Sequence, residues 1–169
     1  MIVVEERIRD VLAGLPSTPI MYDNVLTPFR HVFDWGTKED LNIFLQQEKK
    51  QYPLIWLETG FEETHNNAEK TVEVAISLKI ATYGINPSLF NQERLNLTFK
   101  EVLFPLLENV RKTFERSNIV QIDGQNWDIT KFYNYGTSTK TETTDIWDAL
   151  KFDVNLIIND DCIVPVNYG

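Results

Sequence analysis

The stretch VEVAISLKI, residues 72–80, decides the fold class, because large hydrophobic residues alternate along it with polar or small ones. The large hydrophobic residues all fall on even positions: Val72, Val74, Ile76, Leu78 and Ile80. Successive side chains of a strand point to opposite faces of the sheet, so one face is predicted to be buried and the other to be exposed to solvent. Such one-sided burial is typical of an antiparallel sheet. The stretch LKFDVNLII, residues 150–158, repeats the alternation and predicts a second strand.

Hydrophobic residues at helical spacing predict three helical regions, in residues 4–15, 37–49 and 95–116. Thr37 and Asp40 resemble a capping box, with Asp in place of Glu, at the start of the second region. Thr98, with Glu101 three residues later, is interpreted as another helix cap. Pro105 lies inside the third region, where an interior proline costs about 3 kcal/mol. We therefore expect a kink or a break just before it.

Shorter strands are predicted in residues 20–22, 29–33, 54–57 and 119–122, with a bend at Asp23 and Asn24 between the first two. Residues 58–69 are polar and acidic and too long for a two-residue turn, which predicts a projecting β-hairpin loop. No linker or internal repeat divides the chain. We expect one α+β domain over residues 1–169, with an antiparallel or mixed sheet and helices packed on one face.

The charge balance excludes several classes of function. The 169 residues include 25 acidic and 16 basic side chains, a formal net charge of −9. Binding to phosphate backbones needs clustered Lys and Arg, so generic DNA binding is not expected. The acidity is regional: residues 1–69 hold 12 acidic and 6 basic residues, and residues 142–161 hold 6 acidic residues and one basic residue.

Membrane and export signals are also missing from the sequence pattern. No hydrophobic run approaches the roughly 20 residues that a membrane helix needs. The N-terminus has no basic segment followed by an apolar one, so we expect no signal peptide and synthesis in the cytoplasm.

The motifs predict no catalytic, metal or cofactor site. The seven glycines are isolated from one another and form no phosphate-binding loop. One cysteine, Cys162, and two histidines, His31 and His65, cannot supply a Cys/His zinc set. Neither histidine lies in a nucleophile elbow. A cofactor is therefore not expected.

Two carboxylates keep an enzymatic alternative open. Asp145 and Asp148 flank Trp147 at a spacing of three residues, which would place both on one face of a helix. Such a pair could act in general acid–base catalysis or bind a divalent cation. Carboxylates are mostly exposed and unpaired, so a solvated acidic face is the simpler interpretation. A small cytoplasmic enzyme that uses this pair remains the alternative.

Large aromatic residues are concentrated in segments predicted to be loops. They are Phe61, Trp127, Phe132, Tyr133 and Tyr135. Rings in loops mark either contact surfaces or local packing, and both interpretations stay open. If they are exposed, a third possibility is an adaptor module whose aromatic side chains bind a partner peptide.

The order of the segments resembles that of a known family. The N-terminal helix and residues 41–45 are followed by the strand YPLIWL (residues 52–57), the acidic hairpin loop and the strand 72–80. NQERL (residues 91–95) and LFPLL (residues 103–107) precede the next helix, and residues 135–136, 145–150 and the closing strand complete the order. Over about residues 1–160 this pattern resembles tail terminator and related head-to-tail joining proteins of long-tailed bacteriophages.

The resemblance implies a structural virion protein, made in the host bacterial cytoplasm, that forms a homo-oligomeric ring, usually of six subunits. Such a ring has no catalytic centre; it ends growth of the tail tube and joins the tail to the head. Its partners would be further copies of itself, the tail tube protein and neck or connector proteins. DNA would be only passing cargo in an acidic channel, where repulsion keeps the polyanion from sticking.

The resemblance also implies which segments make contacts, namely residues 58–69 and 125–143. The candidate interaction residues there are Glu58, Phe61, Glu62, Glu63, His65, Trp127, Phe132, Tyr133 and Tyr135. The candidate channel residues are Asp145, Asp148 and Asp153. Residues 124–144 have no counterpart in the family pattern, which leaves another neck or tail ring of the same virion as an alternative.

Overall fold

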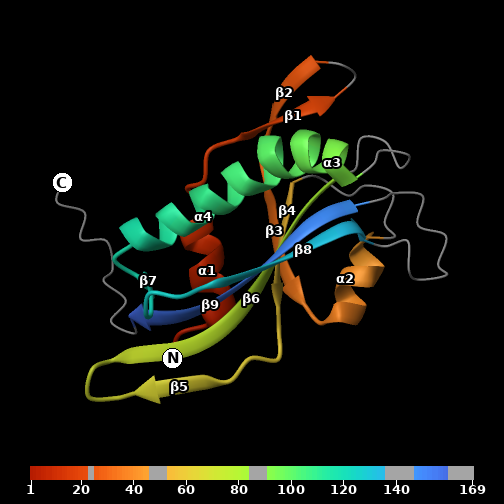
Figure 1. Cartoon of the computed structure of the whole chain (residues 1–169). Coiled ribbons are helices and arrows are strands. Elements are labelled where there is room, and N and C mark those ends of the chain that lie inside the picture. The colour runs from red at the N-terminus through yellow and green to blue at the C-terminus, as the bar shows by residue number, and fades with distance from the viewer. Residues whose placement is uncertain (23–24, 46–52, 84–90, 136–146, 160–169) are drawn as a thin grey trace.

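The computed structural model describes residues 1–22, 25–45, 53–83, 91–135 and 147–159. Its centre is a seven-stranded, mixed and mostly antiparallel sheet (Figure 1). Its strands are β3 (Val32–Gly36), β4 (Leu54–Glu58), β5 (Glu63–Asn66), β6 (Thr71–Tyr83), β7 (Val120–Ile122), β8 (Asp128–Tyr135) and β9 (Trp147–Asn159). The expected α+β class is confirmed.

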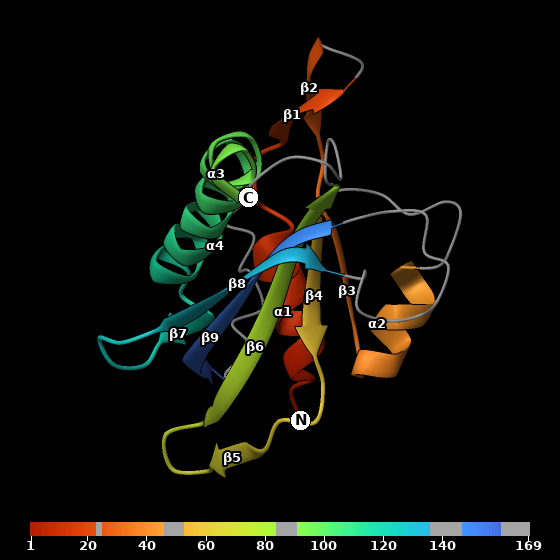
Figure 2. The same cartoon turned by 45° about the vertical axis from the view of Figure 1, so that its right-hand side comes forward.

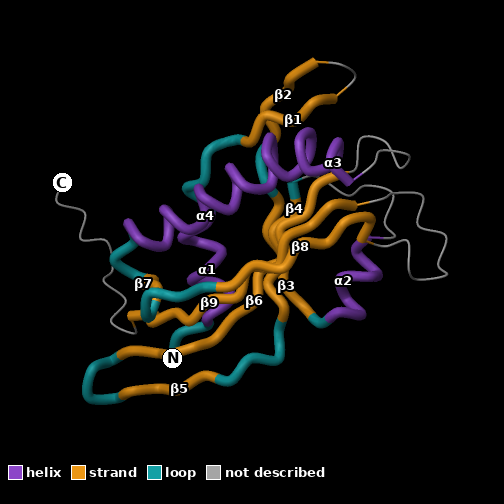
Figure 3. The backbone as a smooth tube through the Cα atoms, viewed as in Figure 1, coloured by secondary structure: helices purple, strands orange, loops and turns teal. Residues whose placement is uncertain are grey.

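Strands β6 and β9 run through the whole sheet, paired residue by residue from Thr71 opposite Asn159 to Tyr83 opposite Trp147 (Figure 3). Each has 13 residues, and the other strands add to their outer edges in two groups. At one end β5 pairs with β6 and β7 with β9; at the other end β4 pairs with β6 and β8 with β9. β3 lies outside β4 as the parallel neighbour. The alternating patterns in residues 72–80 and 150–158 therefore predicted the two central strands correctly.

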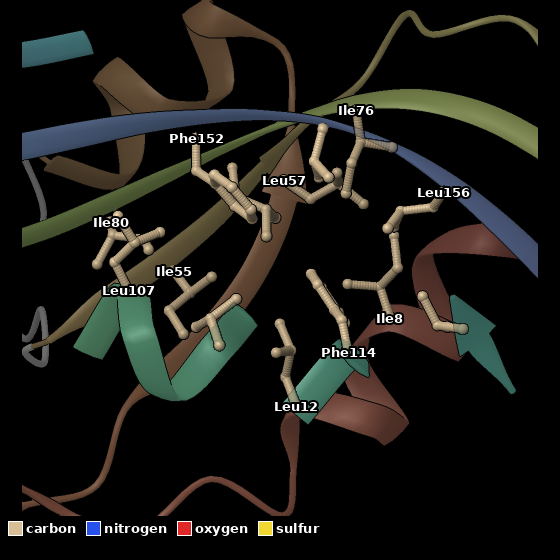
Figure 4. Close-up of a cluster of buried hydrophobic side chains, with 14 of the residues drawn as sticks. Ile8, Leu12, Ile55, Leu57, Ile76, Ile80, Leu107, Phe114, Phe152 and Leu156 are labelled. Atoms are coloured by element: carbon tan, nitrogen blue, oxygen red, sulfur yellow. The ribbon is translucent and has the colours of Figure 1, made fainter. Parts of the chain in front are cut away.

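Helices cover one face of this sheet. They are α1 (Val4–Leu12) and a continuous helical segment made of α3 (Asn91–Arg94), the π-helix η1 (Leu95–Leu103) and α4 (Phe104–Arg116). The main core lies between these helices and the sheet, where Ile8, Leu12, Phe114, Ile80 and Phe152 meet (Figure 4). All five side chains are buried, as the spacing of the sequence predicted.

The change of helix type falls where Pro105 was expected to disturb the helix. η1 ends at Leu103, and Pro105 sits in the first turn of α4, so the residue that lacks an N–H lies where the π-helix changes to an α-helix. The N–H of Phe104 reaches back five residues to the carbonyl of Phe99. Thr98 is buried inside η1 rather than at a helix start, so its assignment as a cap was wrong.

The helix α2 (Lys38–Leu45) departs from the expected one-sided covering. Leu41 of α2 packs with Leu54, Trp56, Ala81 and Ala149, all from the face opposite the main core. Figure 2 shows α2 and α1 on different sides of the sheet. All four residues Leu54, Ile55, Trp56 and Leu57 are buried, because at this end both faces of β4 are covered.

The predicted capping box of α2 is confirmed. The N–H of Thr37 donates to Asp40 Oδ2 at 2.9 Å, and the N–H of Asp40 donates to Thr37 Oγ1 at 3.2 Å. Each side chain thus satisfies a backbone N–H that the helix leaves free. Trp56 Nε1 donates to the carbonyl of Gly36 at 3.3 Å, which fixes the turn between β3 and α2 to the sheet.

Two segments differ from the strand predictions. β1 (Thr18–Tyr22) and β2 (Val25–Phe29) form a separate two-stranded sheet, so the strand predicted over residues 29–33 is divided between β2 and β3. The predicted loop at residues 58–69 contains β5, which extends the sheet as a projecting hairpin with β6. The predicted helix residues 46–49 lie outside the described residues.

Candidate interaction surfaces

The hairpin formed by β5 and β6 carries several of the acidic residues that were named as candidate interaction residues from the sequence. Glu62, Glu63 and His65 are exposed on it, and His65 Nε2 lies 3.0 Å from Glu63 Oε2. These side chains are available to a partner. Glu58, at the end of β4, is different, because its Oε2 lies 3.3 Å from the Nζ of Lys79, whose side chain is only 7% exposed.

Phe61 belongs to the core more than to a contact surface. Its ring is partly buried and packs against the main hydrophobic cluster. Burying a ring favours folding through the area removed from water. Of the two interpretations left open for the aromatic residues, local packing thus applies to Phe61, which attaches the segment before β5 to the domain.

The aromatic residues around β8 are divided between the two faces of the sheet. Phe132 packs against the small cluster beside α2, whereas Tyr133 stacks on Phe99 of η1 with ring centroids 4.6 Å apart. Both were expected in a loop, but both lie in a strand and pack locally. Tyr135 ends β8, and its side chain lies outside the described residues.

Among the described aromatic side chains around β8, Trp127 is the most exposed, at 37% of its maximum. One side of its ring meets Phe152 edge to face at 5.6 Å, and the Arg111 guanidinium lies 5.9 Å from its centroid. Arg111 also bonds Glu108 and Glu115 on α4. The hydrogen bond from Arg111 lowers the pKa of Glu108 below its usual value. Trp127 is thus held by local contacts and offers only part of its ring to a partner.

Asp148 cannot line a channel, which corrects its assignment as a channel residue. Its side chain is 0% exposed, and its Oδ1 accepts a hydrogen bond from Nη1 of Arg94 at 3.1 Å. Arg94, at the end of α3, is itself 1% exposed. This ion pair joins the helix-covered face of β9 to the helical segment, so it is structural. Asp145 lies outside the described residues.

Asp153 lies on the outer face of the sheet, opposite the main core, and is partly exposed. Ser77 Oγ donates a hydrogen bond to its carboxylate, and Lys151 Nζ lies 3.6 Å from it. Asp128 of β8 stands directly across from it in the register. Two carboxylates opposite each other repel, and Lys151 offsets part of that repulsion. This is a polar, negatively biased surface.

Among the described residues, no three His, Cys, Asp or Glu side chains are placed to hold a metal ion together. In the same residues, no helix combines the length and the apolar character needed to cross a bilayer.

The sequence predicted the strand at residues 20–22, but not that β1 pairs with β2 as a separate sheet. We name this sheet, residues 18–29, the arm. Val25 and Leu26 near its tip are each 62% exposed. The available signal was the charge pattern, since residues 15–29 contain a single charged residue, Asp23. At the base of the arm, burial and then the neighbouring Arg30 charge lower the pKa of His31 below its usual value.

Comparison with known proteins adds no assignment, because no family model and no curated protein matches this chain.

Proposed function

We propose that this chain is a structural virion protein of a tailed phage. In this proposal its copies form a ring, with six subunits, at the head-proximal end of the tail. The ring ends growth of the tail tube and joins the tail to the head. The protein is made in the host cytoplasm and then becomes part of the virion.

The observation that carries this proposal is the placement of two hairpins around one sheet. The arm extends from one end of the molecule, and the hairpin of β5 and β6 extends from the other (Figures 1 and 2). A ring subunit needs two different surfaces, one for each neighbour, because a ring contact is heterologous.

The charges support the same proposal. Glu62, Glu63, Glu69 and Glu73 are exposed in residues 62–73, where Lys70 is the one Lys or Arg. A surface of this kind repels the phosphate backbone over about a Debye length, roughly 8 Å at physiological salt. Placed at the rim of a channel, it would let DNA pass without binding it.

Other functions receive less support from the geometry. A second neck or tail ring of the same virion would use the same features and remains the nearest alternative. An enzyme that uses Asp145 with Asp148 is disfavoured, because Asp148 is buried against Arg94 and does not face a substrate.

The proposal is tested by the state of the purified protein and its effect on tails. We expect light scattering to give a multiple of the 19.7 kDa subunit mass, electron microscopy to show rings, and added protein to bind one end of purified tail tubes. A phage that lacks the gene should make tails of uncontrolled length. A protein that stays monomeric at high concentration and does not bind tubes would contradict the proposal.

A further inference from the structure

One dipeptide of this chain has the chemistry for a change in its own backbone. Asp123 is followed by Gly124, and none of the other six glycines has Asp or Asn before it. The nitrogen of the residue after an aspartate can attack the side-chain carboxyl group, because the product is a five-membered ring. Glycine permits this attack best, since it has no Cβ to shield its nitrogen.

The structure leaves this dipeptide accessible. Asp123 and Gly124 lie in the connection between β7 and β8, where they and the following Gln125 and Asn126 are all exposed. Figure 2 shows this connection projecting from the sheet, at the lower left. Among the described residues, no atom beyond the chain neighbours lies within 4 Å of the place that a Cβ at Gly124 would take. Water and the carboxyl group can therefore reach the Gly124 nitrogen.

The backbone of the dipeptide is fixed on one side only. The N–H of Asp123 donates to the carbonyl of Asn155 at 2.8 Å, at the end of the pairing between β7 and β9. Gly124 follows with a φ of +81°, in the left-handed region, and its N–H donates to no backbone carbonyl of the described residues. In the turn between β5 and β6 the side chain is held instead, because Asn66 Oδ1 accepts two backbone N–H groups.

We propose that Asp123 is a site of spontaneous backbone isomerisation to isoaspartate. The Gly124 nitrogen forms a bond to Cγ of Asp123, the carboxyl group loses its hydroxyl, the nitrogen loses its proton, and one water molecule leaves. Water then adds to one carbonyl carbon of the cyclic imide and breaks the bond from that carbon to the nitrogen. Opening at the main-chain carbonyl gives isoaspartate, and opening at the side-chain carbonyl restores aspartate. No oxidant, reductant or further reactant takes part.

The product differs from the original chain in geometry alone. Its mass and its net charge are unchanged, but the main chain passes through Cβ and Cγ of residue 123 and is one atom longer. The carboxylate is left on Cα. This connection leads to Trp127, whose ring meets Phe152 and the Arg111 guanidinium, so isomerisation alters the link between β7 and these contacts. The inference is independent of the proposed ring.

The test follows the full-length, folded chain during incubation. Peptide mapping with electron-transfer fragmentation distinguishes isoaspartate from aspartate, and a protein-L-isoaspartate methyltransferase with labelled S-adenosylmethionine measures its amount. We expect isoaspartate to accumulate at residue 123. Asp128 is the internal control, because it is also exposed but lies in β8 and precedes the β-branched Ile129. Equal conversion at both residues, or none at residue 123, would overturn the proposal.

Variants of the dipeptide test the ring closure itself. Asp123→Glu keeps the charge but requires a less favourable six-membered ring. Gly124→Ala places a methyl group beside the attacking nitrogen, so both variants should convert at least about tenfold more slowly. Alanine is strained at this positive φ, so Asp123→Glu, with a melting temperature equal to that of the wild type, is the decisive variant. Unchanged conversion in Asp123→Glu would overturn the proposal.

The dependence on pH separates this reaction from the deamidation of asparagine. Ring closure at Asp123 requires the neutral carboxylic acid, so conversion should be faster in mildly acidic than in mildly alkaline solution. Asp123→Asn should reverse this dependence, because an amide stays open to attack at every pH and loss of the N–H proton speeds the attack. A wild-type rate that rises with pH would overturn the proposal.

A comparison with the unfolded chain tests the accessibility of the dipeptide. The folded chain and the chain in urea should convert residue 123 at rates of the same order, because the fold neither buries the dipeptide nor bonds the Gly124 N–H to a described backbone carbonyl. If the folded chain converts more than about 100-fold more slowly, the fold protects the dipeptide and the proposal is overturned.

Discussion

The two faces of the central sheet each carry an ion pair, but the surroundings of the pairs are opposite. On the helix-covered face, Arg94 and Asp148 are almost completely removed from water. On the outer face, the side chains of Lys151 and Asp153 are each about a third exposed. Burial strengthens the attraction between charges but also imposes a large desolvation cost. The buried pair therefore constrains the fold, whereas the exposed pair only adjusts the surface.

The largest predicted effect comes from breaking the buried pair. Asp148→Asn leaves the Arg94 charge buried opposite a neutral group, so we expect the free energy of unfolding to fall by about 3–5 kcal/mol. Urea denaturation followed by circular dichroism measures this. The double variant Arg94→Met with Asp148→Leu should recover most of the loss. A loss below about 1 kcal/mol in the single variant would show that the pair does not constrain the fold.

The second prediction concerns the tight packing of α2 on the outer face. A methyl group at Gly36 would lie 2.8 Å from Asp40 Cβ and from Trp56 Cζ2. Because neighbouring groups would have to move, Gly36→Ala should cost about 1–3 kcal/mol. Gly14→Ala is the control, since its added methyl would meet only an ordinary contact at 3.7 Å. Equal stability of the two variants would argue against tight packing under α2.

The third prediction compares the helix starts on the two faces. Thr37→Ala removes half of the capping box of α2 and should lower the free energy of unfolding by about 1 kcal/mol. Helix α1 has no side-chain cap, because Val3 occupies that position in an extended conformation. Val3→Ser should therefore stabilise the protein. Thermal melts of both variants provide the measurement, and shifts of the same sign would contradict this comparison.

The fourth prediction is the exposed counterpart of the first. Asp153→Asn removes the partner of Lys151 and the acceptor of Ser77 Oγ. Because this pair is partly solvated, we expect a loss below about 1 kcal/mol that shrinks further at high salt. Urea denaturation at low and high ionic strength checks it. An effect as large as that of Asp148→Asn would remove the distinction between the faces.

The last prediction concerns His31, which lies outside both faces. Its protonation changes the free energy of unfolding only in mildly acidic solution. Burial and the Arg30 charge lower the pKa of His31 below 6.5 in the folded state, so the unfolded chain takes up the proton first. Its contribution to stability is full above pH 6.5 and is lost as the pH falls towards the folded pKa. His31→Gln should remove this part of the pH dependence in urea titrations. An unchanged slope would contradict it.

Local patterns in the sequence predicted most of the fold. The alternation in β6 and β9 and the capping box at Thr37 depend on residues only a few positions apart, so a single stretch of sequence reveals them. The position of α2 was missed, although four consecutive buried residues in β4 signal that both of its faces are covered.

The contacts of the candidate site depend on distant residues and could not be predicted in this way. Arg94 and Asp148 are separated by 54 positions, and neither has a local pattern that identifies its partner. Phe132 and Tyr133 are adjacent in the sequence but pack on opposite faces, because successive side chains of a strand alternate. The sequence analysis missed this arrangement because it took this strand for a loop.

The long pairing of β6 with β9 has a mechanical consequence. Thirteen residue pairs join these strands, and the hydrogen bonds of antiparallel strands are perpendicular to the strand direction. A pull along the strands loads these bonds sideways and together, so sliding one strand past the other requires many of them to break at once. The sheet would thus resist tension best when the force acts along β6 and β9. A force that peels β5 away from β6 would instead break the few hydrogen bonds of β5 one after another.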